Sequence, residues 1–130
     1  MKLRPLGRSD LSIVPIVFGG NVFGWTLDEK QSFEILDRFV DLGFNAIDTA
    51  DIYSRWAPGN KGGESETIIG KWIKARGKRH DIMLFTKVGG DTGKGSTDLS
   101  RDHILRSLDE SLKRLQTDHI DLYFTHFDDE

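Results

Sequence analysis

Cysteine is absent from this sequence, and so is any long uninterrupted apolar segment. Without cysteine, the 130-residue chain has no disulfide framework and no thiolate chemistry. No stretch approaches the roughly 20 apolar residues that a membrane-spanning helix needs. The first residues, Met1 to Pro5, also lack the apolar core of a secretion signal. We therefore expect a soluble protein of the cytoplasm.

Basic residues are not in excess over acidic residues either. Lysine and arginine number 18 and aspartate and glutamate 21, so the net charge is −3 at pH 7. This balance produces no field that would attract nucleic acid or an anionic membrane. The four histidines are scattered, without the paired spacing of a zinc site: His80, His103, His119 and His126. The composition therefore predicts no nucleic-acid partner, no membrane partner and no bound metal ion.

The sequence does contain a regular alternation of short apolar runs and amphipathic segments. A polar turn at residues 8–10 between two short runs predicts a β-hairpin over residues 1–15. The following runs predict strands at 16–18, 44–47, 82–86 and 120–125, and the amphipathic segments predict helices at 28–43, 64–77 and 100–115. The last helix has the clearest apolar stripe: Ile104, Leu105, Leu108, Leu112 and Leu115.

Strands that alternate with helices are typical of a parallel sheet with right-handed crossovers. A doubly wound fold usually has a G-x-G-x-x-G turn after its first strand, but residues 19–24 read G-G-N-V-F-G. A β-hairpin before the first strand instead fits a TIM-type barrel, in which the hairpin closes one end of the barrel. Because such a barrel takes about 250 residues, we expect residues 1–130 to form an α/β unit: the N-terminal half of a (β/α)8 barrel, ending in a fourth strand near 120–126.

Four polar residues stand at or just beyond the carboxyl ends of successive predicted strands: Asp48, Tyr53, Lys87 and His126. In a TIM-type barrel these ends form one mouth, so the four side chains should converge. Each residue alone has an ordinary structural explanation, such as a turn cap, a half-buried aromatic ring or a solvated charge. Four such coincidences at one mouth are much less frequent, so the pattern favours a catalytic site.

The four side chains suit proton transfer. A tyrosine hydroxyl is a poor acid near neutral pH unless a nearby cation stabilises its anion. A lysine ammonium supplies that cation, and a carboxylate keeps the lysine charged and oriented. A histidine at the same mouth can hydrogen-bond the oxygen of a carbonyl substrate. Because none of these groups donates hydride, a reduction would need a redox cofactor.

With these residues the sequence resembles the aldo-keto reductases. The resemblance is carried by D-T-A-D-I-Y at residues 48–53, by Lys87 and His126, and by the motifs at residues 7–20, 62–70 and 108–123. The family implies a (β/α)8 barrel, NADPH as the cofactor, and reduction of a small carbonyl compound to an alcohol. By the same resemblance Tyr53 would be the general acid, Lys87 and Asp48 would tune it, and His126 would orient the carbonyl.

The resemblance also implies binding residues beyond the four catalytic candidates. Gly20, Asn21 and Asp48 would lie beside the nicotinamide end of the cofactor. Trp25 and Trp56, with His126, would form walls of the substrate pocket, although the two tryptophans have an ordinary alternative as loop anchors.

Two departures from the family pattern keep other interpretations open. His126 is followed by Phe127 and Asp128, where many members have Trp and then Pro. The later strands of the family, which grip the cofactor phosphates, do not occur in these 130 residues. The substrate and the choice of NADPH over NADH therefore stay undetermined. The alternatives are a non-catalytic or redox-sensing regulatory subunit, as in potassium-channel β subunits, and an inactive truncated fragment that associates with itself.

Overall fold

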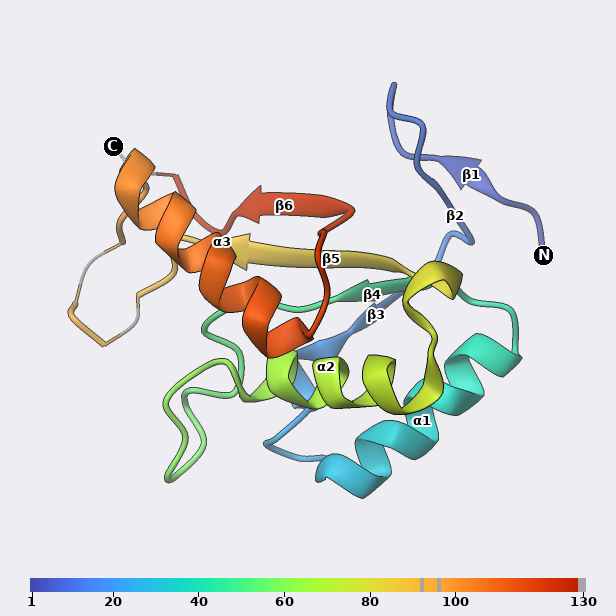
Figure 1. Ribbon diagram of the computed structural model, residues 1–130, viewed down its shortest axis with the longest axis horizontal. Helices are drawn as coiled ribbons and strands as arrows, with labels where there is room; N and C mark the ends of the chain where they lie inside the picture. Colours follow the sequence, from blue (N-terminus) through green and yellow to red (C-terminus); the bar gives the residue numbers. More distant parts are fainter. Residues whose placement is uncertain (92, 96, 129–130) are drawn as a thin grey trace.

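The computed structural model describes residues 1–91, 93–95 and 97–128 (Figure 1). At the N-terminus, β1 (Arg4–Pro5) and β2 (Ser12–Ile13) pair antiparallel and form the expected hairpin. The side chain of Asn45 attaches this hairpin to the sheet. Its Oδ1 accepts a hydrogen bond from the Val14 amide at 2.9 Å, and its Nδ2 donates to the Ser12 carbonyl at 3.1 Å.

Four parallel strands form the sheet: β3 (Val17–Gly19), β4 (Ala46–Asp48), β5 (Met83–Val88) and β6 (Leu122–Thr125). Their order in space is their order in the chain, so each strand pairs with the strand that follows it. This arrangement confirms the prediction of an α/β unit built as the N-terminal part of a TIM-type barrel. The hairpin lies at the end where the strands begin, opposite the loops that follow them (Figure 1).

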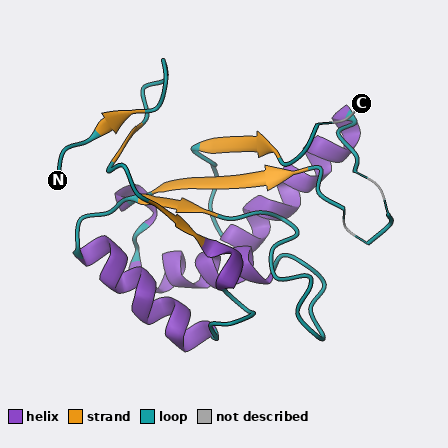
Figure 2. Cartoon of the chain, turned by 180° about the vertical axis from the view of Figure 1, so that it is seen from behind, coloured by secondary structure: helices purple, strands orange, loops and turns teal. Residues whose placement is uncertain are grey.

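Three helices cover one face of the sheet (Figure 2): α1 (Glu29–Asp41), α2 (Glu64–Arg76) and α3 (Arg101–Leu115). Asp28 and Gln31 form a capping box at the start of α1, each side chain bonding the other residue's amide. Gly77 ends α2 in the left-handed conformation, with φ of 62°. None of the helices among the described residues is long and apolar enough to cross a membrane.

Two short 3₁₀ helices were not predicted from the sequence: η1 (Gly20–Val22) directly after β3, and η2 (Arg79–Asp81) before β5. Each fills a connection where the sequence has no apolar periodicity. Gly19, the last residue of β3, pairs with Asp48 of β4. Because η1 follows Gly19 directly, it lies at the end of the sheet where Asp48 is found.

The two faces of the sheet differ in how they are covered. On the helix-covered face, Ile47 and Leu84 are buried in one large cluster with apolar residues of all three helices, such as Trp72. On the other face, Ala46 and Phe85 pack with residues of the hairpin in a smaller cluster. The edge strands are open there: Val17 in β3 and Phe124 in β6 are 42% and 40% exposed.

Helix α3 packs on α2, and its apolar stripe is buried only in part. Leu115 of the stripe is buried, as are Ser107 and Ser111, whereas Leu105 is 46% exposed. At Gly70 in α2, a Cβ atom would collide with the backbone of Arg114 and Leu115 in the last turn of α3. Glycine at this position therefore allows the two helices to approach closely.

A carboxylate is buried between α2, α3 and the sheet. Glu66 is fully buried, and its two oxygens accept hydrogen bonds from Arg114 Nε and Thr86 Oγ1, both at 2.6 Å. Glu66 lies in the first turn of α2, where a carboxylate is favoured by the helix dipole. Its main partners instead come from α3 and β5, so this ion pair joins both helices to the helix-covered face of the sheet.

Candidate active site

Asp48 and Lys87 come from neighbouring strands of the sheet. Asp48 is the last residue of β4, as predicted. Lys87 was predicted just beyond its strand, but β5 runs one residue farther, to Val88. Because side chains alternate along a strand, Lys87 lies on the same face as Phe85, the face that the helices leave uncovered. The two charged groups therefore meet at the carboxyl end of the sheet.

The ammonium group of Lys87 lies at the centre of the site. It donates to Asp48 Oδ2 at 2.6 Å, to the Thr49 carbonyl at 2.9 Å and to the Tyr53 hydroxyl at 2.9 Å. The side chains of Lys87 and Asp48 are only 16% and 20% exposed. The Tyr53 hydroxyl is also 3.5 Å from Asp48 Oδ2. One cation is thus shared between a carboxylate and a phenol in a half-buried environment.

The loop after β4 holds Tyr53 in place by an unusual backbone conformation. Ser54, the next residue, has φ of 69°, which is left-handed and uncommon for a residue other than glycine. Its buried hydroxyl donates to the Phe23 carbonyl at 2.5 Å, and its own carbonyl accepts from Asn60 at 2.9 Å. This role of Ser54 was not predicted from the sequence. The strain at one residue is compensated by hydrogen bonds that fix the position of the phenol.

His126 faces the same space as Tyr53. It follows β6, and its amide donates to the Val88 carbonyl at 2.8 Å. The centres of the His126 and Tyr53 rings are 5.9 Å apart, and Phe127 stacks on the other imidazole face at 4.7 Å. Burial and the positive charge of Lys87 lower the pKa of His126, while Asp48 opposes them. The imidazole is therefore neutral at pH 7, and its buried Nδ1 has no hydrogen-bond partner among the described residues.

Two tryptophans border the phenol on its outer side. Trp56 contacts Tyr53 edge-to-face with ring centres 6.1 Å apart, and Trp25 contacts Trp56 at 5.6 Å in the same manner. Their side chains are about half exposed, 50% for Trp25 and 49% for Trp56. The indoles thus present a broad apolar surface next to the hydroxyl of Tyr53.

Gly20 and Asn21, the cofactor-binding candidates, lie in η1 at the same end of the sheet. A Cβ atom at Gly20 would come within 2.9 Å of the Asp48 carbonyl oxygen and 3.1 Å of Ser65 Oγ. The glycine is thus required for packing of the protein against itself. Asn21 is partly exposed, and its backbone carbonyl lies 3.4 Å from Ser54 Oγ. Among the described residues, no group of three or more potential metal ligands is present.

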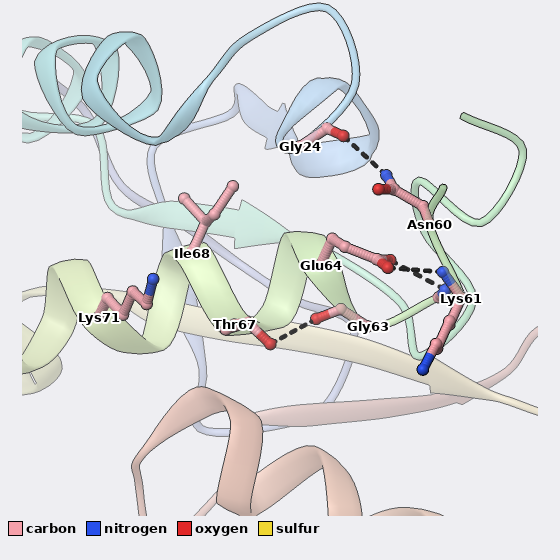
Figure 3. Close-up of a pocket in the computed structure, with 9 residues that line it drawn as sticks. Gly24, Asn60, Lys61, Gly63, Glu64, Thr67, Ile68 and Lys71 are labelled. Atoms are coloured by element: carbon pink, nitrogen blue, oxygen red, sulfur yellow. Dashed lines mark hydrogen bonds between the residues drawn. The ribbon is translucent and has the colours of Figure 1, made fainter. Parts of the chain in front are cut away.

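A separate hollow of about 350 Å³ lies beside the first turn of α2 (Figure 3). Its polar groups already have partners within the protein. Glu64 accepts from the amides of Lys61 and Gly62 at 2.6 and 2.9 Å, and Asn60 donates to the Gly24 carbonyl at 2.8 Å. None of the catalytic candidates lines this hollow. The chemistry of the chain is therefore concentrated around Lys87.

The chain is similar in sequence and in fold to known proteins. Residues 15–130 match the sequence profile of a family described as the Aldo/keto reductase family. Over 92 residues the chain is 67% identical to an uncharacterized 11.2 kDa protein in the crtE 3′ region of Pseudescherichia vulneris, a match that covers 70% of this chain and 89% of that protein.

Longer proteins are similar along nearly all of this chain. A probable voltage-gated potassium channel subunit beta of Arabidopsis thaliana is 36% identical over 129 residues, which is 97% of this chain and 37% of that protein. Among solved structures, the aldo-keto reductase AKR11C1 from Bacillus halodurans in its holo form gives a TM-score of 0.78 at 42% identity, covering 95% of this chain and 39% of the other. The chain thus spans well under half of these two longer relatives.

Proposed function

The chain belongs to the aldo/keto reductase family, of which it is an N-terminal portion, and we propose that it supplies the proton-donating half of an NADPH-dependent carbonyl reductase. The observation that carries this proposal is the ammonium of Lys87 bonded at once to Asp48 Oδ2 at 2.6 Å and to the Tyr53 hydroxyl at 2.9 Å. A phenol held against a fixed cation is suited to give up its proton and to remain as a stabilised anion.

The proposed reaction adds a hydride to the carbonyl carbon of an aldehyde or ketone and a proton to its oxygen. A bound reduced nicotinamide supplies the hydride. Tyr53 supplies the proton, and the Lys87 ammonium at 2.9 Å stabilises the tyrosinate that is left. Asp48 keeps the ammonium oriented and balances its charge. Proton and hydride together convert the carbonyl to an alcohol.

His126 positions the carbonyl in this proposal. Its imidazole is neutral, because its pKa is lowered, so it can hydrogen-bond a carbonyl oxygen without adding a charge to the site. Its Nδ1 atom has no hydrogen-bond partner among the described residues, so the imidazole still has an unused hydrogen-bonding position. The indoles of Trp25 and Trp56 extend from Tyr53 as an apolar wall, which favours carbonyl compounds that carry an aromatic or bulky apolar group.

The residues at this end of the sheet fit the nicotinamide end of a cofactor. Asn21 offers an uncharged amide beside the mouth, and Asp48 and Tyr53 lie within reach of the same space. Gly20 would contribute through its backbone only, because its missing side chain is explained by packing. We place the cofactor's reacting ring at this mouth, and we propose NADPH because it is the cofactor that the family implies.

The test measures reduced-nicotinamide consumption with a panel of aldehydes and ketones. It uses the 130-residue chain alone and the same chain joined after β6 to the C-terminal portion of a full-length family member. We expect the joined protein to reduce apolar aldehydes with NADPH and the chain alone to be inactive. A joined protein that binds NADPH, seen by nicotinamide fluorescence, but reduces no carbonyl of the panel would contradict the proposal.

A second candidate is a regulatory subunit that binds a nicotinamide cofactor without turning it over. The similarity to a probable potassium channel subunit beta favours it. The same assay separates the two, because a regulator would retain bound cofactor without consuming it whatever carbonyl is supplied.

A further inference from the structure

A second cavity, of about 340 Å³, lies away from the catalytic candidates. It is bounded by the loop before α2, the loop between β5 and α3, and α3 itself. Two carboxylates, Asp51 and Glu110, line it, and basic side chains outnumber them: Lys61, Lys94, His103, Arg106 and Arg114. None of the residues of the candidate active site lines it.

The basic residues come from three separate segments and converge on one space. In α3, His103, Arg106 and Arg114 recur at helical spacing and so share one face of the helix. Lys94 comes from the loop that precedes this helix, and Lys61 from the loop that precedes α2. Figure 3 shows the Lys61 amino group pointing away from Gly24, and Lys61 borders both this cavity and the hollow drawn there.

Three of these cations have no anion of their own. Within the described residues, no carboxylate lies within 4.0 Å of Lys61, Lys94 or Arg106. Arg114, by contrast, is bonded to the buried Glu66 at 2.6 Å. Lys61, Lys94 and Arg106 repel one another at this hollow. The lining carboxylates Asp51 and Glu110, and Asp98 near Arg106, offset this repulsion only in part.

The floor of the cavity contains an unsatisfied polar atom. Asp51 Oδ1 is buried without a hydrogen-bond partner among the described residues. Burial and the neighbouring Glu66 raise the pKa of Asp51 to about 6, although Arg114 opposes them. A protonated Asp51 would offer a hydrogen-bond donor to an anion in the cavity, and the approach of an anion favours that protonated form.

We propose that this cavity binds the phosphate group of a small molecule, held by Lys61, Lys94 and Arg106 above Asp51. Guanidinium and ammonium groups together match the tetrahedral oxygens of phosphate. The volume lies in the range of small-molecule sites, about 300–1,000 Å³, and exceeds what the phosphate alone needs. Because the whole chain carries a net charge of −3, a long polyanion is a poorer match than a single phosphate group.

Calorimetric titration of the purified 130-residue chain tests the proposal, with ionic strength held constant by chloride. One arm uses inorganic phosphate and the other ribose 5-phosphate, which separates a free anion from a phosphate ester. We expect saturable binding of one ligand per chain. Tighter binding of the ester would show that the organic part also contacts the cavity, and equal binding would assign inorganic phosphate.

Charge-removing variants locate the binding. Arg106→Gln and Lys94→Gln should each weaken phosphate binding about tenfold, because the loss of one charged hydrogen bond usually has an effect of about this size. Lys113→Gln removes the same charge from α3 outside the cavity and should leave the affinity unchanged. Asp51→Asn should strengthen binding at neutral pH. All these positions except Asp51 are exposed, so circular dichroism should show an intact fold.

Three results would overturn the proposal. One is the absence of saturable binding in both arms. Another is equal weakening in Arg106→Gln, Lys94→Gln and Lys113→Gln, which would mean that phosphate senses only the net charge. Tighter, multiple-site binding of a single-stranded polynucleotide than of either phosphate would also reject it, in favour of a polyanion-binding surface.

Discussion

The two faces of the four-stranded sheet have different tasks. The helix-covered face is densely packed, with Ile47, Leu84 and Trp72 buried in one cluster and Glu66 neutralised by Arg114. The open face carries the charged cluster around Lys87 and leaves apolar side chains of the edge strands in contact with solvent. A single sheet thus separates the residues that stabilise the fold from those that we propose carry the chemistry.

The chain's two tyrosines show this difference most directly. Tyr53 lies at the end of the open face, with its hydroxyl bonded to Lys87. Tyr123 points to the other face, where its buried hydroxyl has no partner among the described residues. Burial and the negative charges of Asp51 and Glu66 raise the pKa of Tyr123 far above its ordinary value. The same side chain is therefore available for proton transfer on one face and inert on the other.

The largest expected effect concerns the uncovered apolar surface of the open face. We expect the 130-residue chain to pair with a second copy, β6 of each copy lying beside β3 of the other, so that eight parallel strands enclose both open faces. The free energy involved is comparable with the stability of a whole domain, about 5–15 kcal/mol. Light scattering during gel filtration measures the mass, and a stable monomer of 14.7 kDa would contradict this expectation.

Two variants distinguish pairing through the sheet edges from nonspecific hydrophobic association. Phe124→Glu places a charge on an edge strand of the open face and should shift the equilibrium toward smaller species. Leu42→Glu changes an equally exposed apolar residue at the end of α1 and should leave the mass unchanged. Equal behaviour of both variants would argue against pairing through the sheet edges.

Removing the proposed proton donor should have the next largest effect. In the joined protein, Tyr53→Phe should lower turnover about 10²–10⁴-fold, the usual contribution of a positioned acid. NADPH affinity should barely change, because the ring remains. Tyr123→Phe is the matched control and should leave turnover unchanged. Steady-state kinetics with a common aldehyde decides, and near-normal turnover in Tyr53→Phe would exclude this residue as the acid.

The helix-covered face can be weakened selectively through its buried ion pair. Arg114→Met leaves the carboxylate of Glu66 buried without a counter-charge, which should cost about 3–5 kcal/mol of unfolding free energy. Arg76→Met breaks the more exposed pair with Asp37 and should change stability little. Urea unfolding followed by circular dichroism compares them. Similar losses of unfolding free energy in both variants would mean that the burial of Glu66 does not make its ion pair more important for stability.

The smallest effect is a pH dependence on the helix-covered face. The pKa of Asp51 is raised to about 6 in the folded protein, so the folded state binds more protons than the unfolded state between about pH 4 and pH 6. The stability that protonation contributes is lost as the pH rises through about 6. Asp51→Asn should therefore stabilise the chain at pH 8, by about 1–2 kcal/mol after allowance for partial exposure, but not at pH 4. Urea titrations at both pH values test this, and an equal gain at pH 4 would reject it.

Much of the fold could be predicted because its signals are local. Asp28 and Gly77 mark helix ends by hydrogen-bonding and conformational rules that need only a few neighbouring residues. The hairpin and the alternation of strands with helices follow from apolar spacing in the same way. These signals were enough to identify the N-terminal portion of a TIM-type barrel.

The features that sequence analysis missed depend on contacts between distant segments. The role of Glu66 requires Arg114, 48 residues away, and the close approach of α3 to α2 depends on Gly70, which lies far from α3 in the sequence. The left-handed Ser54 is fixed by the Phe23 carbonyl, 31 residues earlier. In the site, the positions of Asp48 and Tyr53 could be inferred from the strand end, but the third bond of Lys87, to the Thr49 backbone carbonyl, has no sequence signal.

The match between strand order and chain order has a consequence for synthesis. Since every strand pairs with its successor, β3 and β4 can dock while the rest of the protein is still on the ribosome. At about 5–20 residues per second, Lys87 follows Asp48 by about 2–8 s. During that interval the Asp48 carboxylate is a lone anion at the edge of a growing sheet. When β5 docks, Lys87 neutralises this charge. The ion pair between Lys87 and Asp48 therefore stabilises correct docking of the third strand, and it is the same ion pair that lies in the candidate active site.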